Sequence, residues 1–301
     1  MTKGIPIDPG VAGQWHLTGT WGLNAQSVWA DYTGQGILVG ILDDGFDYLH
    51  TELRGNFRTD LDLDTLNNDA DSYVGAADRH GTSVAGVIGA DDNGVGGVGV
   101  AFDAGLVGIR QGFGAQSDMS NTLDGFIYAR TQNLDVMNNS WGFSNAFSDN
   151  NRLEFNGTDI YQVTNAMADL AAHGRHDLGA NIVFAAGNGR ADGDNTNYHN
   201  FQNSIYSITV AAIQQDGTAA SFSTKGASIL ISAGGVSLQT TDVSGSGGYV
   251  SGDYTTFTGT SAAAPVVSGM VALMLEANPE LGYRDVQEIL AYSATRAGTT
   301  E

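Results

Sequence analysis

The chain has 301 residues, enough for one large α/β domain or two small ones. Hydrophobic residues make up 42% of the chain and charged residues 15%, which is typical of a packed globular protein rather than a disordered one. The 33 acidic and 12 basic residues give a net charge of −21, which argues against nucleic acids and anionic membrane surfaces as partners. The same charge suits cation binding or salty surroundings, or it serves solubility alone.

Other functional classes are excluded by what the chain lacks. It has no cysteine, so it holds neither a disulfide framework nor a thiolate metal site. The first ten residues lack the basic and then apolar run of a signal peptide, and we expect no membrane span. The chain is therefore either a domain of a longer precursor or one whose export signal lies elsewhere.

Apolar runs with glycine-containing turns predict buried strands, and segments with helical spacing lie between them. Because strands alternate with helices, we expect a parallel sheet covered on both faces. No repeat or linker divides the chain, so we expect one domain over residues 1–301. In chain order, the predicted elements are a strand at Ile37–Leu42, a helix at Ser83–Ile88, a strand at Leu106–Ile109, a helix at Leu123–Arg130, a strand at Val136–Met137, a helix at Tyr161–Ala172, strands at Ile182–Ala185, Ile208–Ile213 and Ser228–Ile231, and helices at Ala262–Glu276 and Val286–Ala294.

Three motifs place reactive side chains at the ends of these elements. Asp43 follows the first strand in Asp43-Asp44-Gly45, His80 opens the first helix, and Ser261 opens the long helix in Gly-Thr-Ser-Ala-Ala. Each alone has a simpler interpretation, as a turn, a capping residue or a helix N-cap. Together, in the order Asp, His, Ser, they match the chain order of the catalytic residues of subtilisin.

These residue types are the ones that acyl transfer needs. A serine hydroxyl is a poor nucleophile until an imidazole accepts its proton, and the imidazole needs a carboxylate to fix its tautomer. The helix N-terminus adds partial positive charge and backbone N–H groups beside Ser261. Asn188, which follows a buried strand in Ala-Gly-Asn-Gly, is a candidate second donor to an oxyanion, and the alternative is an ordinary Asn-Gly turn.

The chain resembles the kexin and furin branch of the subtilase family along nearly its whole length. Asp-Asp-Gly, Trp-Gly and Asn-Ser-Ile-Tyr are the motifs most specific to that branch. The segments that carry the resemblance are Gln14–Leu17, Tyr32–Ile37, Ile41–Gly45, Arg79–Thr82, Gly97–Ala101, Ser140–Gly142, Ala186–Gly189, Asn203–Tyr206, Thr240–Asp242, Gly259–Pro265, Leu275–Pro279 and Arg284-Asp285.

The resemblance implies a three-layer subtilisin-like α/β fold, with a mainly parallel seven-stranded sheet and helices on both faces. It also implies roles for individual residues. Asp43, His80 and Ser261 match the catalytic triad, Asn188 matches the oxyanion asparagine, and Asp44 matches an acid in the pocket for the residue before the cleaved one. The two walls of the primary specificity pocket match Ser140, Trp141 and Gly142, and Ala185, Ala186 and Gly187.

Two positions of the specificity pocket depart from the family. Asn145 and His199 stand where pockets for arginine carry acids. A buried guanidinium without a carboxylate is costly. We therefore expect weaker selection for a basic residue at the cleaved position than in furin. We also expect some preference for a basic substrate residue one position earlier, where Asp44 offers a carboxylate.

The resemblance also implies calcium, which prefers oxygen ligands. One ion is expected on Asp8, Glu52 and Asn93 and on backbone carbonyls near Val95 and Gly97. A second candidate is the loop 60–71, where Asp64, Asp69 and Asp71 keep the spacing of another kexin-type site. Close like charges repel unless a cation lies between them, and the alternative is a solvated acidic loop.

The sequence thus predicts a calcium-stabilised serine endopeptidase, secreted or at the cell surface, that acts on proteins or peptides. A propeptide or chaperone-like inhibitor is a further expected partner. One alternative is a catalytically dead subtilase scaffold, which the presence of all four catalytic residue types disfavours. Another is a lipase-type hydrolase, which would place Gly-x-Ser-x-Gly around Ser261.

Overall fold

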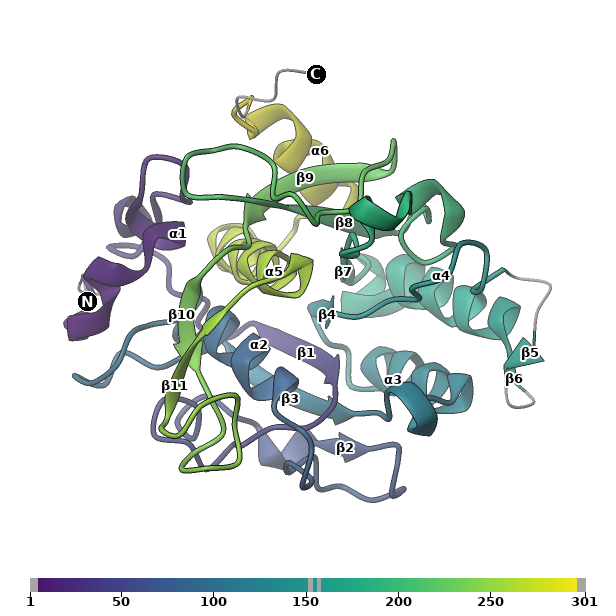
Figure 1. The fold of residues 1–301 in the computed structure, drawn as a ribbon, viewed down its shortest axis with the longest axis horizontal. Coiled ribbons are helices and arrows are strands. Elements are labelled where there is room, and N and C mark those ends of the chain that lie inside the picture. The colour runs from purple at the N-terminus through teal and green to yellow at the C-terminus, as the bar shows by residue number, and fades with distance from the viewer. Residues whose placement is uncertain (1–4, 151–153, 156–157, 297–301) are drawn as a thin grey trace.

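A seven-stranded parallel sheet forms the centre of the molecule (Figure 1). The computed structural model describes residues 5–150, 154–155 and 158–296. The strands lie in the order β2-β3-β1-β4-β7-β8-β9, and every neighbouring pair is parallel. Their bounds are β1 Leu38–Asp43, β2 Leu63–Asp64, β3 Gly105–Arg110, β4 Val136–Asn139, β7 Asn181–Ala185, β8 Ser207–Ile213 and β9 Ile229–Gly234.

Helices cover both faces of the sheet (Figure 1). One hydrophobic cluster joins the sheet to α2 (His80–Gly89), α5 (Thr260–Ala277) and α6 (Tyr283–Ser293). A second cluster joins the opposite face to α3 (Met119–Thr131) and α4 (Ile160–Asp177). Strands buried on both faces are expected to be almost continuously apolar, and β7 is buried at every residue. The predicted three-layer α/β fold is confirmed.

α5 is the one described helix that is long and apolar enough to cross a membrane, with 18 residues. The sequence analysis predicted no such stretch. In the fold, 72% of this segment is buried inside the domain, where α5 lies against β4, β7 and β8 as the central helix. Its apolar composition is thus accounted for by burial in the protein core.

Several short elements were not predicted, because segments of two to five residues carry too little periodicity to be recognised. The largest is a hairpin of β10 (Leu238–Thr241) and β11 (Tyr254–Phe257), which packs against α2. The others are α1 Trp15–Thr18, β2 Leu63–Asp64, β5 Glu154–Phe155, β6 Thr158–Asp159, and the 3₁₀ turns Pro9–Gly13, Ala25–Ser27, Thr59–Leu61, Gly114–Gln116, Arg190–Asp192 and Thr196–Tyr198.

The order of the strands shows where a ligand would bind. From β1 the chain forms β3 on one side of that strand and then returns to form β4 on its other side. β1 is followed by α2 on one face of the sheet, and β4 by α4 on the other. In open parallel sheets, ligands bind beyond the carboxyl ends of the strands at such a reversal. The fold therefore directs attention to the ends of β1 and β4.

Candidate active site

Asp43 and His80 meet at the carboxyl end of β1. Asp43 is the last residue of the strand and is completely buried, whereas His80 is the first residue of α2 and its side chain is 25% exposed. Asp43 Oδ1 lies 2.8 Å from His80 Nδ1 and also accepts the Asp44 N–H at 2.9 Å. A carboxylate at Nδ1 keeps the proton on that nitrogen and leaves Nε2 as the basic atom.

The surroundings of His80 favour its protonated form. Burial by itself lowers the pKa of the imidazole, but the charge of Asp43, its hydrogen bond and the charge of Asp44 together raise the pKa above the ordinary histidine value. The ring of Phe257 packs edge-on at 5.2 Å. The imidazole is thus held in one orientation and prepared to accept a proton.

Ser261 lies in the first turn of α5, beside the end of β4. Since Asn138 pairs with Ile41 in the sheet, Ser140 lies level with Asp43. The Ser140 hydroxyl donates to the Ser261 carbonyl at 3.0 Å, and the Ser261 hydroxyl donates to the Ser140 carbonyl at 2.8 Å. The Ser261 carbonyl is free to accept the Ser140 hydroxyl because its helical partner would be the N–H of residue 265. That residue is Pro265, which has no N–H.

The Ser261 hydroxyl therefore points at a carbonyl rather than at His80 in this structure. The hydroxyl must release this carbonyl before it can donate to the imidazole. Catalytic hydrogen bonds in unliganded enzymes are often long or misaligned and tighten only when substrate binds. The arrangement is compatible with a nucleophile whose hydroxyl is held aside until a substrate arrives.

Asn188 follows β7 and is bound to the same helix terminus. Its Oδ1 accepts both the N–H and the hydroxyl of Thr260, each at 3.0 Å. Because the oxygen is occupied, the Nδ2 group is the part of the amide left to donate, and both Asn188 and Ser261 line one pocket. This Nδ2 also lies close to the backbone of Gly259, since a Cβ added at that glycine would be 3.5 Å from it. This geometry fits a donor to an oxyanion formed beside Ser261.

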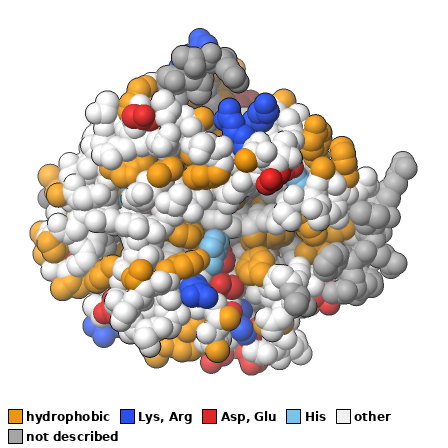
Figure 2. All heavy atoms as spheres, viewed as in Figure 1, with side chains coloured by type: hydrophobic (Ala, Val, Ile, Leu, Met, Phe, Trp, Pro, Cys, Tyr) orange, Lys and Arg blue, Asp and Glu red, His pale blue; other side chains and the backbone are white. Residues whose placement is uncertain are grey.

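The pocket beside Ser261 has a volume of about 320 Å³ and contains most of the predicted substrate-binding residues. Figure 2 shows this face of the molecule, hollowed near its middle, where a histidine lies beside acidic and basic side chains. Asn145 does not line the pocket. It is exposed, in a turn where its carbonyl accepts the N–H and the hydroxyl of Ser148. The lining residues are Ser140–Ser144, Ala185–Gly189, Asp192, Asp194, His199, Gln202, Thr260 and Ser261.

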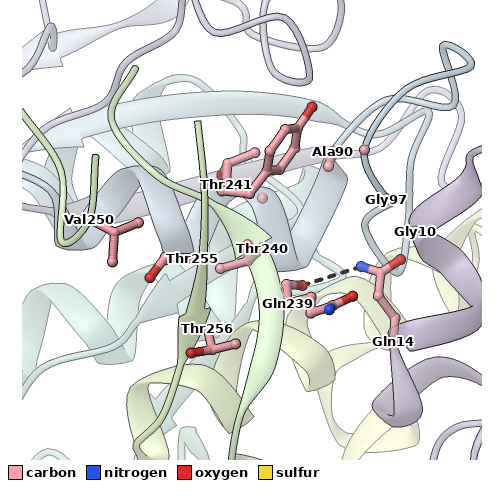
Figure 3. A pocket seen from close by; sticks show the side chains of 13 residues that line it. Gly10, Gln14, Ala90, Gly97, Gln239, Thr240, Thr241, Val250, Thr255 and Thr256 are labelled. Atoms are coloured by element: carbon pink, nitrogen blue, oxygen red, sulfur yellow. Dashed lines mark hydrogen bonds between the residues drawn. The ribbon is translucent and has the colours of Figure 1, made fainter. Parts of the chain in front are cut away.

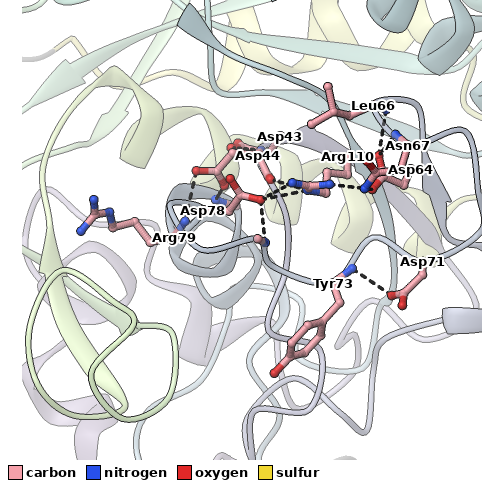
Figure 4. A network of polar contacts seen from close by, with 12 residues as sticks. Asp43, Asp44, Asp64, Leu66, Asn67, Asp71, Tyr73, Asp78, Arg79 and Arg110 are labelled. Carbon is pink, nitrogen blue, oxygen red and sulfur yellow. Dashed lines mark hydrogen bonds and ion pairs between the residues drawn. The ribbon is translucent and has the colours of Figure 1, made fainter. Parts of the chain in front are cut away.

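Asp44 has a structural role that the sequence did not predict. Its Oδ2 accepts the N–H groups of Arg79 (Figure 4) and His80 at 3.1 Å each, and its Oδ1 accepts that of Gly81 at 2.8 Å. A carboxylate at this position caps α2 and interacts favourably with the helix dipole. Burial and the charge of Asp43 raise the pKa of Asp44 to about 6. Its contact with substrate stays a prediction.

In the loop predicted to bind a second calcium ion, Asp64 is paired with Arg110 (Figure 4). Arg110 Nη1 lies 2.6 Å from Asp64, its Nη2 lies 2.7 Å from Asp78, and its Nε donates to the Asp44 carbonyl at 3.0 Å. Asp69 and Asp71 are exposed. In the described part of the chain, no three histidine or acidic side chains form a group that could hold a metal. Asp64 is therefore already paired within the protein, and calcium binding by Asp64, Asp69 and Asp71 stays a prediction.

The first predicted calcium site differs, because its residues lie together with no counter-charge among the described residues. Glu52 Oε2 lies 3.3 Å from Asn93 Nδ2, and Asp8 Oδ1 accepts the Gly94 N–H at 2.5 Å. Both carboxylates are buried, and Asp8 Oδ2 has no hydrogen-bond partner in the structure. Burial and mutual repulsion raise the pKa of Glu52 to about 7, and burial with the charge of Asp92 raises that of Asp8 to about 6. Such a pair fits a divalent cation.

A second hollow, of about 430 Å³, lies between the β10–β11 hairpin, α2 and the N-terminal turns (Figure 3). Its lining is mostly glycine, threonine and glutamine, and Tyr254 is its only titratable side chain. The hydroxyl of Tyr254 donates to Glu52, so this hollow adjoins the Asp8–Glu52 pair rather than the reactive side chains. It offers no nucleophile or base.

The comparison with protein families agrees with this geometry. Residues 34–301 match the model described as the subtilase family. The chain belongs to the subtilase family. Among curated proteins, it is 36% identical to a kexin of Candida albicans over 96% of this chain and 30% of that protein. It is 33% identical to human furin over 97% of this chain and 37% of that protein. It thus spans about a third of the length of these relatives.

Solved structures show the same relationship. A serine protease of Aeromonas sobria superposes with a TM-score of 0.85 and 27% identity, over 98% of this chain and 59% of that one. A protease from Pseudoalteromonas arctica superposes with a TM-score of 0.81 and 28% identity, over 99% of this chain and 94% of that one. The resemblance to the kexin and furin branch and the subtilisin-like fold are both confirmed.

The raised pKa of His80 is testable. In a Ser261→Ala background, which prevents self-cleavage, we expect His80 to titrate above the ordinary histidine value of about 6.5. Asp43→Asn should lower its midpoint, because the negative charge that favours the imidazolium is removed. An NMR pH titration of the imidazole carbons measures both, with the exposed His173 as internal reference. A midpoint unaffected by Asp43→Asn would contradict the assigned pair.

Proposed function

We propose that this chain is a calcium-stabilised serine endopeptidase that hydrolyses peptide bonds through an acyl-enzyme. The observation that carries the proposal is the buried Asp43 hydrogen-bonded at 2.8 Å to His80, at the same sheet edge as a serine in the first turn of a helix. Subtilase membership and relatives named kexin and furin support the same activity.

The proposed reaction uses these groups in sequence. Ser261 Oγ attacks the carbonyl carbon of the substrate while its proton passes to His80 Nε2, and Asp43 stabilises the imidazolium. The tetrahedral oxyanion receives hydrogen bonds from Asn188 Nδ2 and from backbone N–H groups at the start of α5. His80 then donates the proton to the departing amine as the C–N bond breaks, and water hydrolyses the ester by the same steps.

Substrate preference is also part of the proposal. The relationship to the kexin and furin branch supports a preference for basic residues near the cleaved bond, as do Asp192 and Asp194 in the pocket. Asp44 is the candidate acid for the preceding residue, although three backbone N–H groups already occupy its oxygens. We therefore expect only a modest preference there, since the carboxylate must be shared.

Partners and location follow from the relatives. A solved complex pairs the Aeromonas sobria protease with a chaperone, which supports a chaperone-like or propeptide partner for this chain. The net charge of −21 is compatible with a protein that works outside the cell in the presence of cations. We infer secretion or display at the cell surface.

Calcium would be held by Asp8, Glu52 and Asn93, with carbonyls of the 93–97 loop. Its chemistry there is electrostatic, since a hard divalent cation neutralises two buried carboxylates. The site lies at the N-terminal turns and the loop after α2. Its expected contribution is therefore to stability rather than to bond cleavage.

Ser261→Ala tests the nucleophile. We expect peptidase activity to fall by about 10⁶-fold with an unchanged circular dichroism spectrum, because the hydroxyl supplies chemistry rather than packing. Labelling with a fluorophosphonate should also be lost. Ser293→Ala, at an exposed position in α6, is the matched control and should retain both activity and labelling. Normal turnover in Ser261→Ala would reject the triad, and a native protein that is neither active nor labelled would indicate a dead scaffold.

Asn188→Ala tests the oxyanion donor. We expect kcat to fall by about 100- to 1000-fold with little change in KM, because the amide binds the oxyanion of the transition state and not the ground-state substrate. Steady-state kinetics on one peptide substrate measure the two constants separately. A change confined to KM would assign Asn188 to substrate binding instead.

Calcium removal tests the metal site. After long equilibration in chelator at matched ionic strength, the melting temperature should fall, since a cation that binds only the folded state at 100 times its Kd stabilises it by about 2.7 kcal/mol. Asp8→Asn should reduce this response, whereas Asp216→Asn, an exposed acid in a surface turn, should leave it intact. A melting temperature insensitive to chelator would argue against bound calcium.

A further inference from the structure

The floor of the pocket beside Ser261 contains a buried row of charges that the motifs did not predict. His199, which is 2% exposed, lies between two aspartates. Its Nδ1 lies 3.3 Å from Asp149 Oδ1, and its Nε2 lies 2.9 Å from Asp194 Oδ1. Asp149 is completely buried and does not line the pocket, whereas Asp194 and His199 do.

This geometry determines the protonation of the imidazole. An ionised carboxylate only accepts hydrogen bonds, so a histidine bonded to two carboxylates must carry a proton on each nitrogen. The hydrogen bond and charge of Asp149 and those of Asp194 outweigh burial and raise the pKa of His199. The row therefore holds one cation and two anions, with a single net negative charge.

The same contacts limit what His199 and Asp194 can offer to a substrate. Both ring nitrogens are occupied, so His199 has no donor left for the pocket. Asp194 Oδ1 accepts His199 and also the Asn195 N–H at 2.8 Å, and its Oδ2 makes only a long contact of 3.5 Å with the Thr224 hydroxyl. A cationic substrate side chain would therefore meet a carboxylate whose charge is already shared with His199 through Oδ1, with Oδ2 left to accept a hydrogen bond.

Gln202 adds a neutral acceptor at the same floor. It is 3% exposed and lines the pocket, and its Nε2 donates to the Ala185 carbonyl at 3.3 Å. Its Oε1 is buried and has no hydrogen-bond partner in the structure. A buried polar atom without a partner is costly, so this oxygen is available to a donor on a bound side chain, whether that donor is charged or neutral.

We propose that His199 is an internal counter-ion of the specificity pocket, which lowers its selectivity for positive charge and makes it accept long side chains that end in hydrogen-bond donors, cationic or neutral. The inference rests on the proposed peptidase function and deepens it. His199 acts through Asp194 and is a positioning residue, while Asp194 and Gln202 are the groups that contact the substrate side chain.

The test compares peptides that differ only at the cleaved residue. Arginine and citrulline have nearly the same shape and both carry donors, but only arginine is charged, whereas norleucine carries no donor. We expect the native protein to prefer arginine over citrulline by less than about 30-fold in kcat/KM, and to cleave after norleucine most slowly. A larger preference for arginine over citrulline would overturn the proposal.

Two variants should move this ratio in opposite directions. His199→Asn removes the cation and should raise the arginine/citrulline ratio at least about tenfold. Asp149→Asn removes an anion from behind the pocket and should lower the ratio. His173→Asn, an exposed histidine paired with Asp177 on α4, is the matched control and should leave the ratio unchanged.

A general loss of folded enzyme would reduce cleavage of all peptides equally and would leave the arginine/citrulline ratio unchanged. A change in this ratio therefore reports on the pocket itself. Ratios unchanged in both His199→Asn and Asp149→Asn would overturn it. If a variant does not fold, the remaining variant and the ratio of the native protein decide the matter. Failure of the proposed function looks different, because no peptide would then be cleaved and Ser261 would not be labelled.

Discussion

The hydrogen bond between Asp43 and His80 joins two segments that the sequence separates by 36 residues, and the rest of the site depends on it. Asp43 is held by the sheet, because it ends a strand that is buried between two others. His80 is held by α2, whose first N–H groups are bonded to Asp44. The two aspartates thus orient the imidazole together: Asp43 bonds its ring, and Asp44 bonds the start of the helix that carries it.

Some buried carboxylates are paired with a cationic side chain of the protein, and others are not. Arg110 pairs with Asp64 and Asp78, and His199 lies between Asp149 and Asp194. Each cluster contains one cation of its own beside two carboxylates. Asp8 and Glu52 have no ion pair in the described part of the chain, and this difference makes that pair the stronger of the two calcium candidates.

Short-range patterns allowed much of the site to be predicted. The strands at Ile37–Leu42 and Ile182–Ala185 lie within a residue of β1 and β7, because runs buried on both faces are continuously apolar. The walls of the pocket were predicted from motifs at the ends of such strands. Asn145 was misplaced, since a turn closed by Ser148 decides where that side chain lies, and no pattern in the sequence reports the turn.

The sequence by itself determined the fold class, the family, the candidate reactive side chains and the two walls of the pocket beside Ser261, since the last two belong to motifs at strand and helix ends. Only the tertiary structure decided which charges lie together. Asp149 and His199, or Asp64 and Arg110, are about fifty residues apart and belong to no shared motif. Their pairing depends on how loops from separate strands pack at one edge of the sheet, and electrostatic interactions between such groups depend on distance and burial, which the order of residues does not contain.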